Sequence, residues 1–346
     1  MKRFLLLLSY WLLVSRQLLL AQPTPYPTIG QIVRADPRIN KLIPSDAKIE
    51  VLASGFEWTE GPIWVKNGGY LLFSDVPQNT IFKWTLKEGV TPFLKPSGYT
   101  GLMPYSEEPG ANGLTIDQQG RLISCEHGDR RVTAMPLAGG GKRTLADNYN
   151  GKRFNSPNDV VAHSNGSYYF TDPPYGMPKR ENDPSRETEG FGVYRIAPER
   201  AGVPGAVSLV VGDLSRPNGI AFSPDEKTLY VAQSDPSRPL VMAYPIQADG
   251  SVGKGRVAFG PEQMKKQGLE GGFDGMKVDR DGNLWVTGAG GVLVLAPTTG
   301  NGPYDFLGHL NIGGATANCA WGDDGSTLYI TADMYLCRIH TSAKGW

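Results

Sequence analysis

Six residues with oxygen-bearing side chains recur along the chain in one local setting, and together they could hold a hard metal cation. Each opens a short apolar strand that is followed by a turn rich in Asp, Gly or Asn and then by a second β-rich strand, as in residues 217–232. The opening residues are Glu60, Asn112, Asn158, Asn218, Asp274 and Asn318. Two are acids and four are amides, and an oxygen-only set of this kind suits Ca²⁺ better than metals that prefer His or Cys.

A structural explanation of these residues competes with the functional one. Asn-Gly and Asp-Gly pairs are first of all turn formers, and any single opening residue is more often structural than functional. A pure turn role would, however, also allow Gly, Ser or Pro at the opening position. Carboxylate or carboxamide occurs there in all six segments, so we interpret the set as a ligand ring in which two negative charges face a divalent ion.

The spacing of the opening residues indicates how the fold would bring them together. Successive differences of their residue numbers are 52, 46, 60, 56 and 44, which suits one four-stranded blade plus variable loops per repeat. Six repeats predict an all-β fold, a six-bladed β-propeller with a central metal-binding channel. Equivalent positions of the blades lie on a ring around the axis, so the opening side chains can face that channel.

Composition is that of an ordinary globular protein with many turns. Hydrophobic residues make up 40% and charged residues 20% of the chain, with 44 Gly and 27 Pro. The formal net charge is +0 and no long Lys/Arg cluster occurs, so we expect a small-molecule substrate and no nucleic-acid partner.

The first residues form a separate segment. Lys2 and Arg3 precede an apolar run over residues 4–14, which at 11 residues is shorter than the ~20 residues that span a bilayer. We expect a signal peptide over 1–21, cleaved after Ala21, with an uncleaved anchor as the alternative. The remaining chain divides into an N-terminal extension, 22–45, and the propeller, 46–346. The mature protein is then expected to be secreted or periplasmic, without membrane attachment.

Other segments carry structural expectations. Residues 49–53 are expected to form a strand that joins the last blade and closes the ring, which removes an unpaired edge. In blade one we expect strands at 61–65, 70–74 and 80–84, and the best short helix is at 262–267. The loop 96–110 either covers the channel mouth or is a surface excursion, and 179–189 is expected to be an exposed insertion.

Other catalytic and metal-binding motifs are weak. Cys125, Cys319 and Cys337 are an odd, small set, which we interpret as buried apolar residues rather than a disulfide framework. No histidine stands at metal-ligand spacing from His127, which argues against a His-based zinc site. His127 is either a pocket residue or an ordinary loop histidine. No G-x-S-x-G nucleophile motif occurs.

Several motifs in fixed order resemble the gluconolactonase, regucalcin (senescence marker protein) and luciferin-regenerating family. They are residues 60–62 (EGP), 156–159 (SPND), 216–219 (RPNG) and 273–275 (FDG). Residues 126–128 (EHG) and 171–176 (TDPPYG) resemble its bacterial sugar-lactonase branch. The resemblance covers about residues 50–340. It implies a six-bladed propeller with one divalent cation in the channel.

The resemblance also implies roles for individual residues. Glu60, Asn158, Asn218 and Asp274 match the family's metal shell, and Asp274 matches the acid proposed to move protons. The resemblance implies Ca²⁺ as the ion, with Zn²⁺, Mn²⁺ or Mg²⁺ as alternatives. Asn112, His127, Asp159, Tyr175 and Tyr105 are candidates for substrate contacts. Some members carry a substrate-binding Arg near the second opening residue, and no equivalent is placed in this sequence; Arg153 is near Asn158 in sequence but does not align with that Arg.

These features together predict a metal-dependent hydrolase of sugar lactones. The cation would polarise the lactone carbonyl, and Asp274 or a neighbour such as Asp159 would take a proton from water and return it to the ring oxygen. Two alternatives stay open: a non-catalytic propeller that binds a ligand or partner, and an esterase or phosphotriesterase that uses the same metal chemistry.

Overall fold

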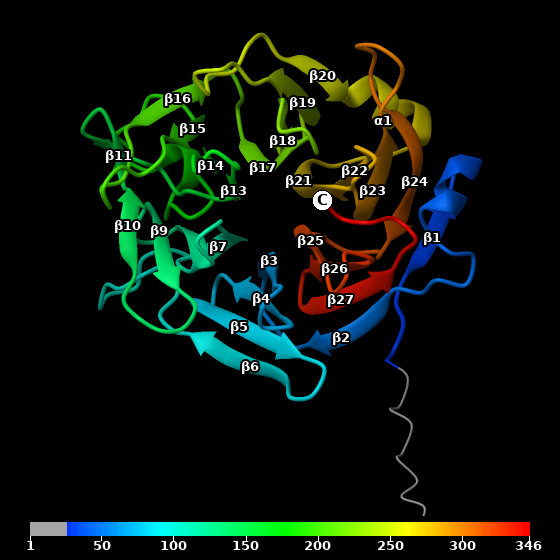
Figure 1. The fold of residues 1–346 in the computed structure, drawn as a ribbon, viewed down its shortest axis with the longest axis horizontal. Coiled ribbons are helices and arrows are strands. Elements are labelled where there is room, and N and C mark those ends of the chain that lie inside the picture. Colours follow the sequence, from blue (N-terminus) through cyan, green and yellow to red (C-terminus); the bar gives the residue numbers. More distant parts are fainter. Residues whose placement is uncertain (1–25) are drawn as a thin grey trace, which may run out of the picture.

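The computed structural model describes residues 26–346, and the predicted signal peptide lies outside them. Six antiparallel sheets are arranged around one axis (Figure 1), which confirms the six-bladed β-propeller. In each blade the strand that begins within two residues of an opening residue lies nearest the centre of the ring. None of the helices in the described part of the chain is long and apolar enough to span a membrane.

The first three blades follow one another directly along the chain. Blade one comprises β3 Thr59–Val65, β4 Tyr70–Asp75, β5 Thr80–Thr85 and β6 Gly89–Leu94. Blade two comprises β7 Ala111–Ile116, β8 Arg121–Glu126, β9 Arg131–Pro136 and β10 Arg143–Ala146. A small hairpin of β11 Asn148–Tyr149 and β12 Lys152–Arg153 follows. Blade three comprises β13 Val160–Ala162, β14 Tyr168–Asp172, β15 Gly192–Ile196 and β16 Val207–Val211, with the 3-10 helix η2 Arg180–Asn182 in its β14–β15 connection.

The last three blades complete the circle. Blade four comprises β17 Pro217–Phe222, β18 Thr228–Gln233, β19 Leu240–Pro245 and β20 Arg256–Phe259. The one α-helix in residues 26–346, α1 Pro261–Gln267, follows it where the sequence predicts a short helix. Blade five comprises β21 Phe273–Val278, β22 Leu284–Gly288, β23 Gly291–Ala296 and β24 Asp305–Asn311. Blade six comprises β25 Asn318–Gly322, β26 Thr327–Ala332 and β27 Tyr335–His340.

The N-terminal part of the chain supplies the outer strands of the last two blades. β2 Glu50–Ser54 pairs antiparallel with β27, so it closes the ring as the sequence predicts. β1 Gln31–Arg34 adds a fifth strand to blade five by pairing with β24. Closure of this kind pairs β27 on both sides, so that β27 is not an unpaired edge strand.

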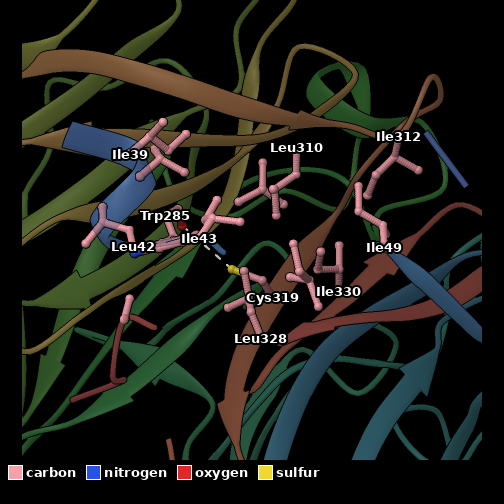
Figure 2. Packing of buried hydrophobic residues seen from close by; sticks show 14 of the residues in the cluster. Ile39, Leu42, Ile43, Ile49, Trp285, Leu310, Ile312, Cys319, Leu328 and Ile330 are labelled. Atoms are coloured by element: carbon pink, nitrogen blue, oxygen red, sulfur yellow. Dashed lines mark hydrogen bonds between the residues drawn. The ribbon is translucent and has the colours of Figure 1, made fainter. Parts of the chain in front are cut away.

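The segment between β1 and β2 packs into the wedge between blades five and six. It contains the 3-10 helix η1 Pro37–Lys41. Ile39 and Ile43 are fully buried there against Trp285 and Leu310 of blade five and Leu328 of blade six (Figure 2). The three cysteines are buried and free, as predicted, and Cys319 belongs to this same core.

Candidate metal and substrate site

Five of the six opening residues line a single pocket of about 220 Å³. Five further residues, one of which is the predicted contact Tyr175, complete the wall of the pocket. The lining residues are Trp58, Glu60, Glu108, Asn112, Asn158, Tyr175, Arg180, Asn218, Ser234 and Asp274. The four residues that the family resemblance assigns to a metal shell are therefore neighbours in space, although up to 214 residues (274 − 60) separate them along the chain.

The glycine that follows an opening residue lets the inner strands approach closely. A Cβ on Gly61 would lie 2.0 Å from the backbone oxygen of Asn112, and one on Gly219 would lie 2.2 Å from that of Asp274. Real Cβ atoms do not make such contacts, so any larger residue would push neighbouring blades apart. The glycine after Glu60, Asn218 or Asp274 thus allows the inner strands to lie close to the axis, and the opening side chains lie close to one another as a result.

Hydroxyl groups on the second strands fix the backbone of the opening residues of the next blade. Ser74 Oγ donates to the carbonyl oxygen of Asn112 at 2.9 Å, and Thr171 Oγ1 donates to that of Asn218 at 2.7 Å. Because each bond joins two blades and is buried, it locks the inner strands in register around the axis.

Burial, helped by neighbouring negative charges, raises the pKa of the acids in the pocket. Burial raises the pKa of Glu60 to about 8, helped by the charges of Asp159 and Glu108. Burial raises the pKa of Asp274 well above its usual range, and Glu60, Asp159 and Glu108 act in the same direction. Such a cluster of carboxylates holds protons at neutral pH unless a positive charge compensates them.

The donor set fits a hard divalent cation. Asn112 Oδ1 is buried and has no hydrogen-bond partner within residues 26–346, as expected for an oxygen whose partner is an ion. Within the same residues, no three His, Cys, Asp or Glu side chains lie close enough together to hold a metal. Amide oxygens would therefore have to complete the shell around Glu60 and Asp274, in the mixed carboxylate and carbonyl environment that Ca²⁺ accepts.

Asp159 and the sixth opening residue, Asn318, lie near the pocket but do not line it. Asn318 Nδ2 donates to Asp159 Oδ2 at 3.4 Å, although the two residues belong to blades on opposite sides of the ring. Lys277 Nζ donates to Asn318 Oδ1 at 3.3 Å. These contacts fill the channel beside the pocket with a polar network.

Two of the remaining predicted contacts also lie outside the pocket lining. His127 is fully buried behind it, with Nδ1 3.1 Å from the backbone oxygen of Glu108, and burial lowers its pKa to about 4. Tyr105 stacks on Tyr99 with ring centroids 5.2 Å apart. Tyr175, by contrast, lines the pocket and shares a hydrogen bond with Ser234 Oγ.

Sequence reasoning did not propose Trp58, Glu108, Arg180 or Ser234 as site residues. Glu108 belongs to the loop 96–110, so this loop contributes a side chain to the pocket wall. Arg180 belongs to the segment 179–189, which is largely exposed as predicted, yet its side chain lines the pocket. No repeat marks these positions, because the loops differ from blade to blade.

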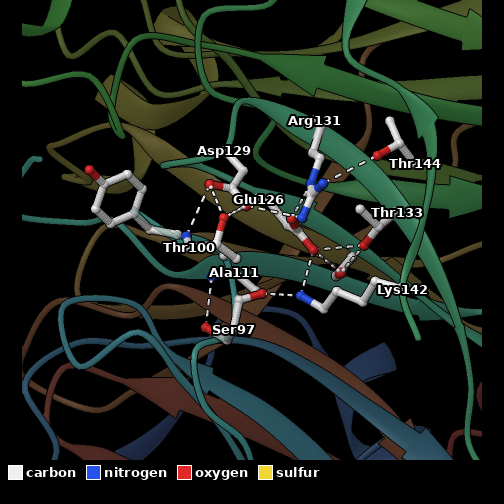
Figure 3. A network of polar contacts seen from close by, with 12 residues as sticks. Ser97, Thr100, Ala111, Glu126, Asp129, Arg131, Thr133, Lys142 and Thr144 are labelled. Carbon is white, nitrogen blue, oxygen red and sulfur yellow. Dashed lines mark hydrogen bonds and ion pairs between the residues drawn. The ribbon is translucent and has the colours of Figure 1, made fainter. Parts of the chain in front are cut away.

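A buried polar network fixes the loop 96–110 to blade two (Figure 3). Glu126 is fully buried and accepts from Arg131 Nε at 2.6 Å and from Lys142 Nζ at 2.5 Å. Lys142 Nζ also donates to the backbone oxygen of Ser97, and the backbone N–H of Thr100 donates to Asp129 Oδ1 at 3.0 Å. The first residues of the loop are thereby held by charged groups of blade two.

The other end of the loop 96–110 is tied to the same blade by its backbone. The N–H of His127 donates to the oxygen of Gly110 at 3.1 Å, and the N–H of Gly128 donates to that of Pro109 at 3.0 Å. Glu108 therefore projects into the pocket from a loop whose two ends are fixed.

Comparison with known proteins places this architecture in a family. Residues 58–333 match the family model described as SMP-30/Gluconolactonase/LRE-like region. The chain is 39% identical to a gluconolactonase of Zymomonas mobilis over 321 residues, which are 92% of this chain and 88% of that protein. The solved structure of a gluconolactonase from Xanthomonas campestris matches with a TM-score of 0.75 and 29% identity over 93% of this chain and 99% of that one.

A more distant structure shares the fold. The regucalcin of Agrobacterium tumefaciens matches with a TM-score of 0.64 and 21% identity, over 86% of this chain and 94% of that one. The family match spans most of the propeller and includes five of the six opening residues on the pocket wall. The chain belongs to the SMP-30/gluconolactonase/LRE-like family.

Proposed function

We propose that this protein hydrolyses a sugar lactone with the help of one divalent cation, most simply Ca²⁺. The observation that carries the proposal is the convergence of two acids and three amides from five different blades on one pocket. A propeller that serves only as an interaction platform has no need for such a set at its axis. The name of the Zymomonas mobilis relative supports the choice of substrate class.

Glu60, Asn158, Asn218 and Asp274 would hold the cation, with Asn112 beside them. When bound, a divalent cation supplies Lewis-acid polarisation of a carbonyl oxygen and stabilises negative charge that develops there. The lining of the pocket combines the polar side chains of the opening residues with the aromatic rings of Trp58 and Tyr175, so it can accommodate both charge and a ring.

Asp274 would act as the proton acceptor. Its carboxylate takes a proton from the attacking water and returns it to the ring oxygen as the ester bond breaks. Burial, together with the negative neighbours Glu60 and Asp159, raises the pKa of this carboxylate above that of an exposed aspartate. Asp159 is the second candidate for this role, because it is buried in the same channel and accepts a hydrogen bond from Asn318.

A reconstitution screen tests the function. Protein treated with a chelator would be assayed on sugar lactones, aryl esters and phosphotriesters, before and after addition of Ca²⁺, Zn²⁺, Mn²⁺ or Mg²⁺. We expect metal-dependent hydrolysis that is fastest on a sugar lactone. Faster turnover of an aryl ester or phosphotriester would assign a different substrate to the same site. Absence of turnover on every compound with every metal would favour a binding role.

We also propose that the protein acts outside the cytoplasm, because residues 1–21 have the charge and apolar pattern of a signal peptide. Sequencing the N-terminus of protein recovered from the periplasm or medium tests this. A chain that starts at Gln22 is expected, and a cytoplasmic chain that retains Met1 would contradict it.

A further inference from the structure

Two loops that are not part of the sixfold repeat place opposite charges on the wall of the pocket. Glu108 comes from the connection between blades one and two, and Arg180 comes from the long connection between β14 and β15. The half-buried Trp58 lies on the same wall. None of these three residues is an opening residue. They line the pocket, but they are not among the proposed metal ligands.

Glu108 is rigidly presented. The segment that carries it is fixed by the backbone bonds of Pro109 and Gly110 to blade two, and the Glu108 carbonyl oxygen faces the His127 ring at 3.1 Å. Its side chain is only 22% exposed. Its carboxylate lines the pocket, with Oε2 4.0 Å from Nδ1 of His127, and it can accept hydrogen bonds from a ligand bound there.

Arg180 is also held by its surroundings. Its backbone N–H donates to Met177 at 3.1 Å, and its carbonyl accepts from the N–H of Asp183 at 3.1 Å. The next residue, Glu181, forms an ion pair with Arg216 of blade four at 2.6 Å. The loop therefore stands at a defined position over the pocket.

The guanidinium of Arg180 keeps most of its donors free. Within residues 26–346 its one ion-pair partner is Glu107, at 3.9 Å, and that carboxylate is 93% exposed. Exposed pairs of this length contribute little. The five N–H groups of an arginine in such a place remain able to bind a ligand.

We propose that Arg180 and Glu108 bind the hydroxyl groups of the substrate and make the site selective for polyhydroxylated lactones. Arginine only donates, and Glu108 only accepts once it is ionised, above its raised pKa of about 7, so a ligand that satisfies both must carry donors and acceptors. Vicinal hydroxyl groups do so. Trp58 adds a flat apolar surface for the C–H face of a sugar ring. This inference rests on the proposed lactone hydrolysis and extends it to the part of the substrate that does not react.

A binding experiment tests the inference without requiring turnover. The probe is anhydro-D-glucitol, a pyran ring with hydroxyl groups and no carbonyl, and tetrahydropyran is the matched ring without hydroxyl groups. Both would be titrated calorimetrically into the full-length protein with Ca²⁺ present. We expect Arg180→Met and Glu108→Gln each to weaken binding of anhydro-D-glucitol by roughly 10- to 100-fold, the range for charge-assisted hydrogen bonds.

Matched controls lie next to each residue. Lys179→Met removes a cation from the same loop, and Glu107→Gln removes an acid from the other loop, at side chains that do not line the pocket. These variants should bind within about 2-fold of the unmodified protein. Equal affinity in all variants, absence of anhydro-D-glucitol binding, or equal binding of tetrahydropyran would overturn the inference.

Kinetics separate this inference from the proposed function. On D-glucono-δ-lactone, kcat/KM of Arg180→Met and Glu108→Gln should fall by about 10- to 100-fold. On δ-valerolactone, which has no hydroxyl groups, their kcat/KM should stay unchanged. Equal losses on both lactones would overturn selectivity through hydroxyl groups. If the unmodified protein cleaves neither lactone, the proposed function fails, and the calorimetric result alone still decides whether the wall binds a polyol.

Discussion

Burial and neighbouring charges raise the pKa of both Glu60 and Asp274, but the roles proposed for the two acids in metal binding and proton transfer differ. Glu60 and Asp274 are both candidate ligands, but only Asp274 is proposed to accept a proton. Each sits among other buried carboxylates. Substitutions that remove charge but keep shape therefore distinguish the two roles at the scale of single residues.

Glu60→Gln and Asp274→Asn should both weaken the metal, because a hard cation depends on anionic oxygens. At saturating metal, however, Glu60→Gln should recover most of its lactonase rate. Asp274→Asn should stay ~10²–10⁴-fold below the unmodified enzyme, because added metal does not replace a general base. The measurement is rate against metal concentration for both variants. Equal recovery would remove Asp274 as the base and shift the role to Asp159.

The metal-free protein should lose stability as pH rises. The pKa of Glu60 in the folded protein is about 8, above its ordinary value of 4.5, and that of Glu108 is about 7. Between the ordinary pKa of a glutamate and its raised pKa in the folded protein, the folded state holds a proton that the unfolded state has released. The free energy of unfolding therefore falls as the pH rises through this range. Thermal melts in chelator should show a decreasing Tm from about pH 5 to about pH 8.

Adding Ca²⁺ should raise this Tm most at the upper end of the range, because the ligands must lose their protons to bind metal. The comparison variant is Glu60→Gln, which cannot titrate at this position and should show a shallower decrease. An identical slope in the two proteins would mean that Glu60 is not among the groups responsible.

At the scale of elements, the inner strands form the scaffold that positions the ligands. The residue after each of four opening residues is glycine, namely Gly61, Gly113, Gly219 and Gly275. An added Cβ at any of them would lie 2.5 Å or less from an atom of the neighbouring blade. Strand spacing at the axis thus depends on the absence of a side chain, and the proposed metal site would depend on that spacing.

Gly219→Ala should destabilise the fold by about 1–3 kcal/mol, the usual cost of overpacking. It should also weaken metal binding, because the clash is with the backbone of Asp274 itself. Denaturant unfolding and calorimetric titration measure the two effects. Gly314→Ala is the control, since a Cβ there meets nothing within 4 Å, and it should stay within ±0.5 kcal/mol. Normal metal affinity in Gly219→Ala would show that the spacing at this strand does not matter.

At the scale of the whole molecule, the chain closes its ring with a segment that precedes the first blade. β2 pairs with β27, β1 extends blade five, and the residues between them fill the wedge between the last two blades. The N-terminal residues therefore contribute to the same core as the strands of blades five and six. Stability of the propeller should depend on them as on any internal residue.

Ile43→Ala should cost about 2–5 kcal/mol, as for large-to-small changes in a packed core, although Ile43 lies outside the repeats. Its side chain is fully buried among residues of blades five and six. Leu86→Ala is the control, because Leu86 is 72% exposed, and it should stay within ±0.5 kcal/mol. Denaturant unfolding measures both, and a cost for Ile43→Ala as small as the control's would indicate that the wedge is loosely packed.

The sequence by itself determined the repeated features of this protein. The period of the strands predicted six blades, the segment around residue 50 predicted ring closure, and the opening residues predicted which side chains meet at the axis. These inferences succeed because a propeller repeats one local pattern. Position within the repeat then specifies position in space, and five of the six opening residues do line one pocket.

Only the tertiary structure decided what stands on the wall of that pocket. Glu108, Arg180 and Trp58 line it, while His127 is buried behind Glu108 and Tyr105 stacks on Tyr99. These residues belong to loops or loop edges, where no period relates sequence to direction. Their places depend on contacts between distant segments, such as Glu126 with Lys142 and Glu181 with Arg216. Non-local contacts of this kind leave no pattern that a single sequence displays.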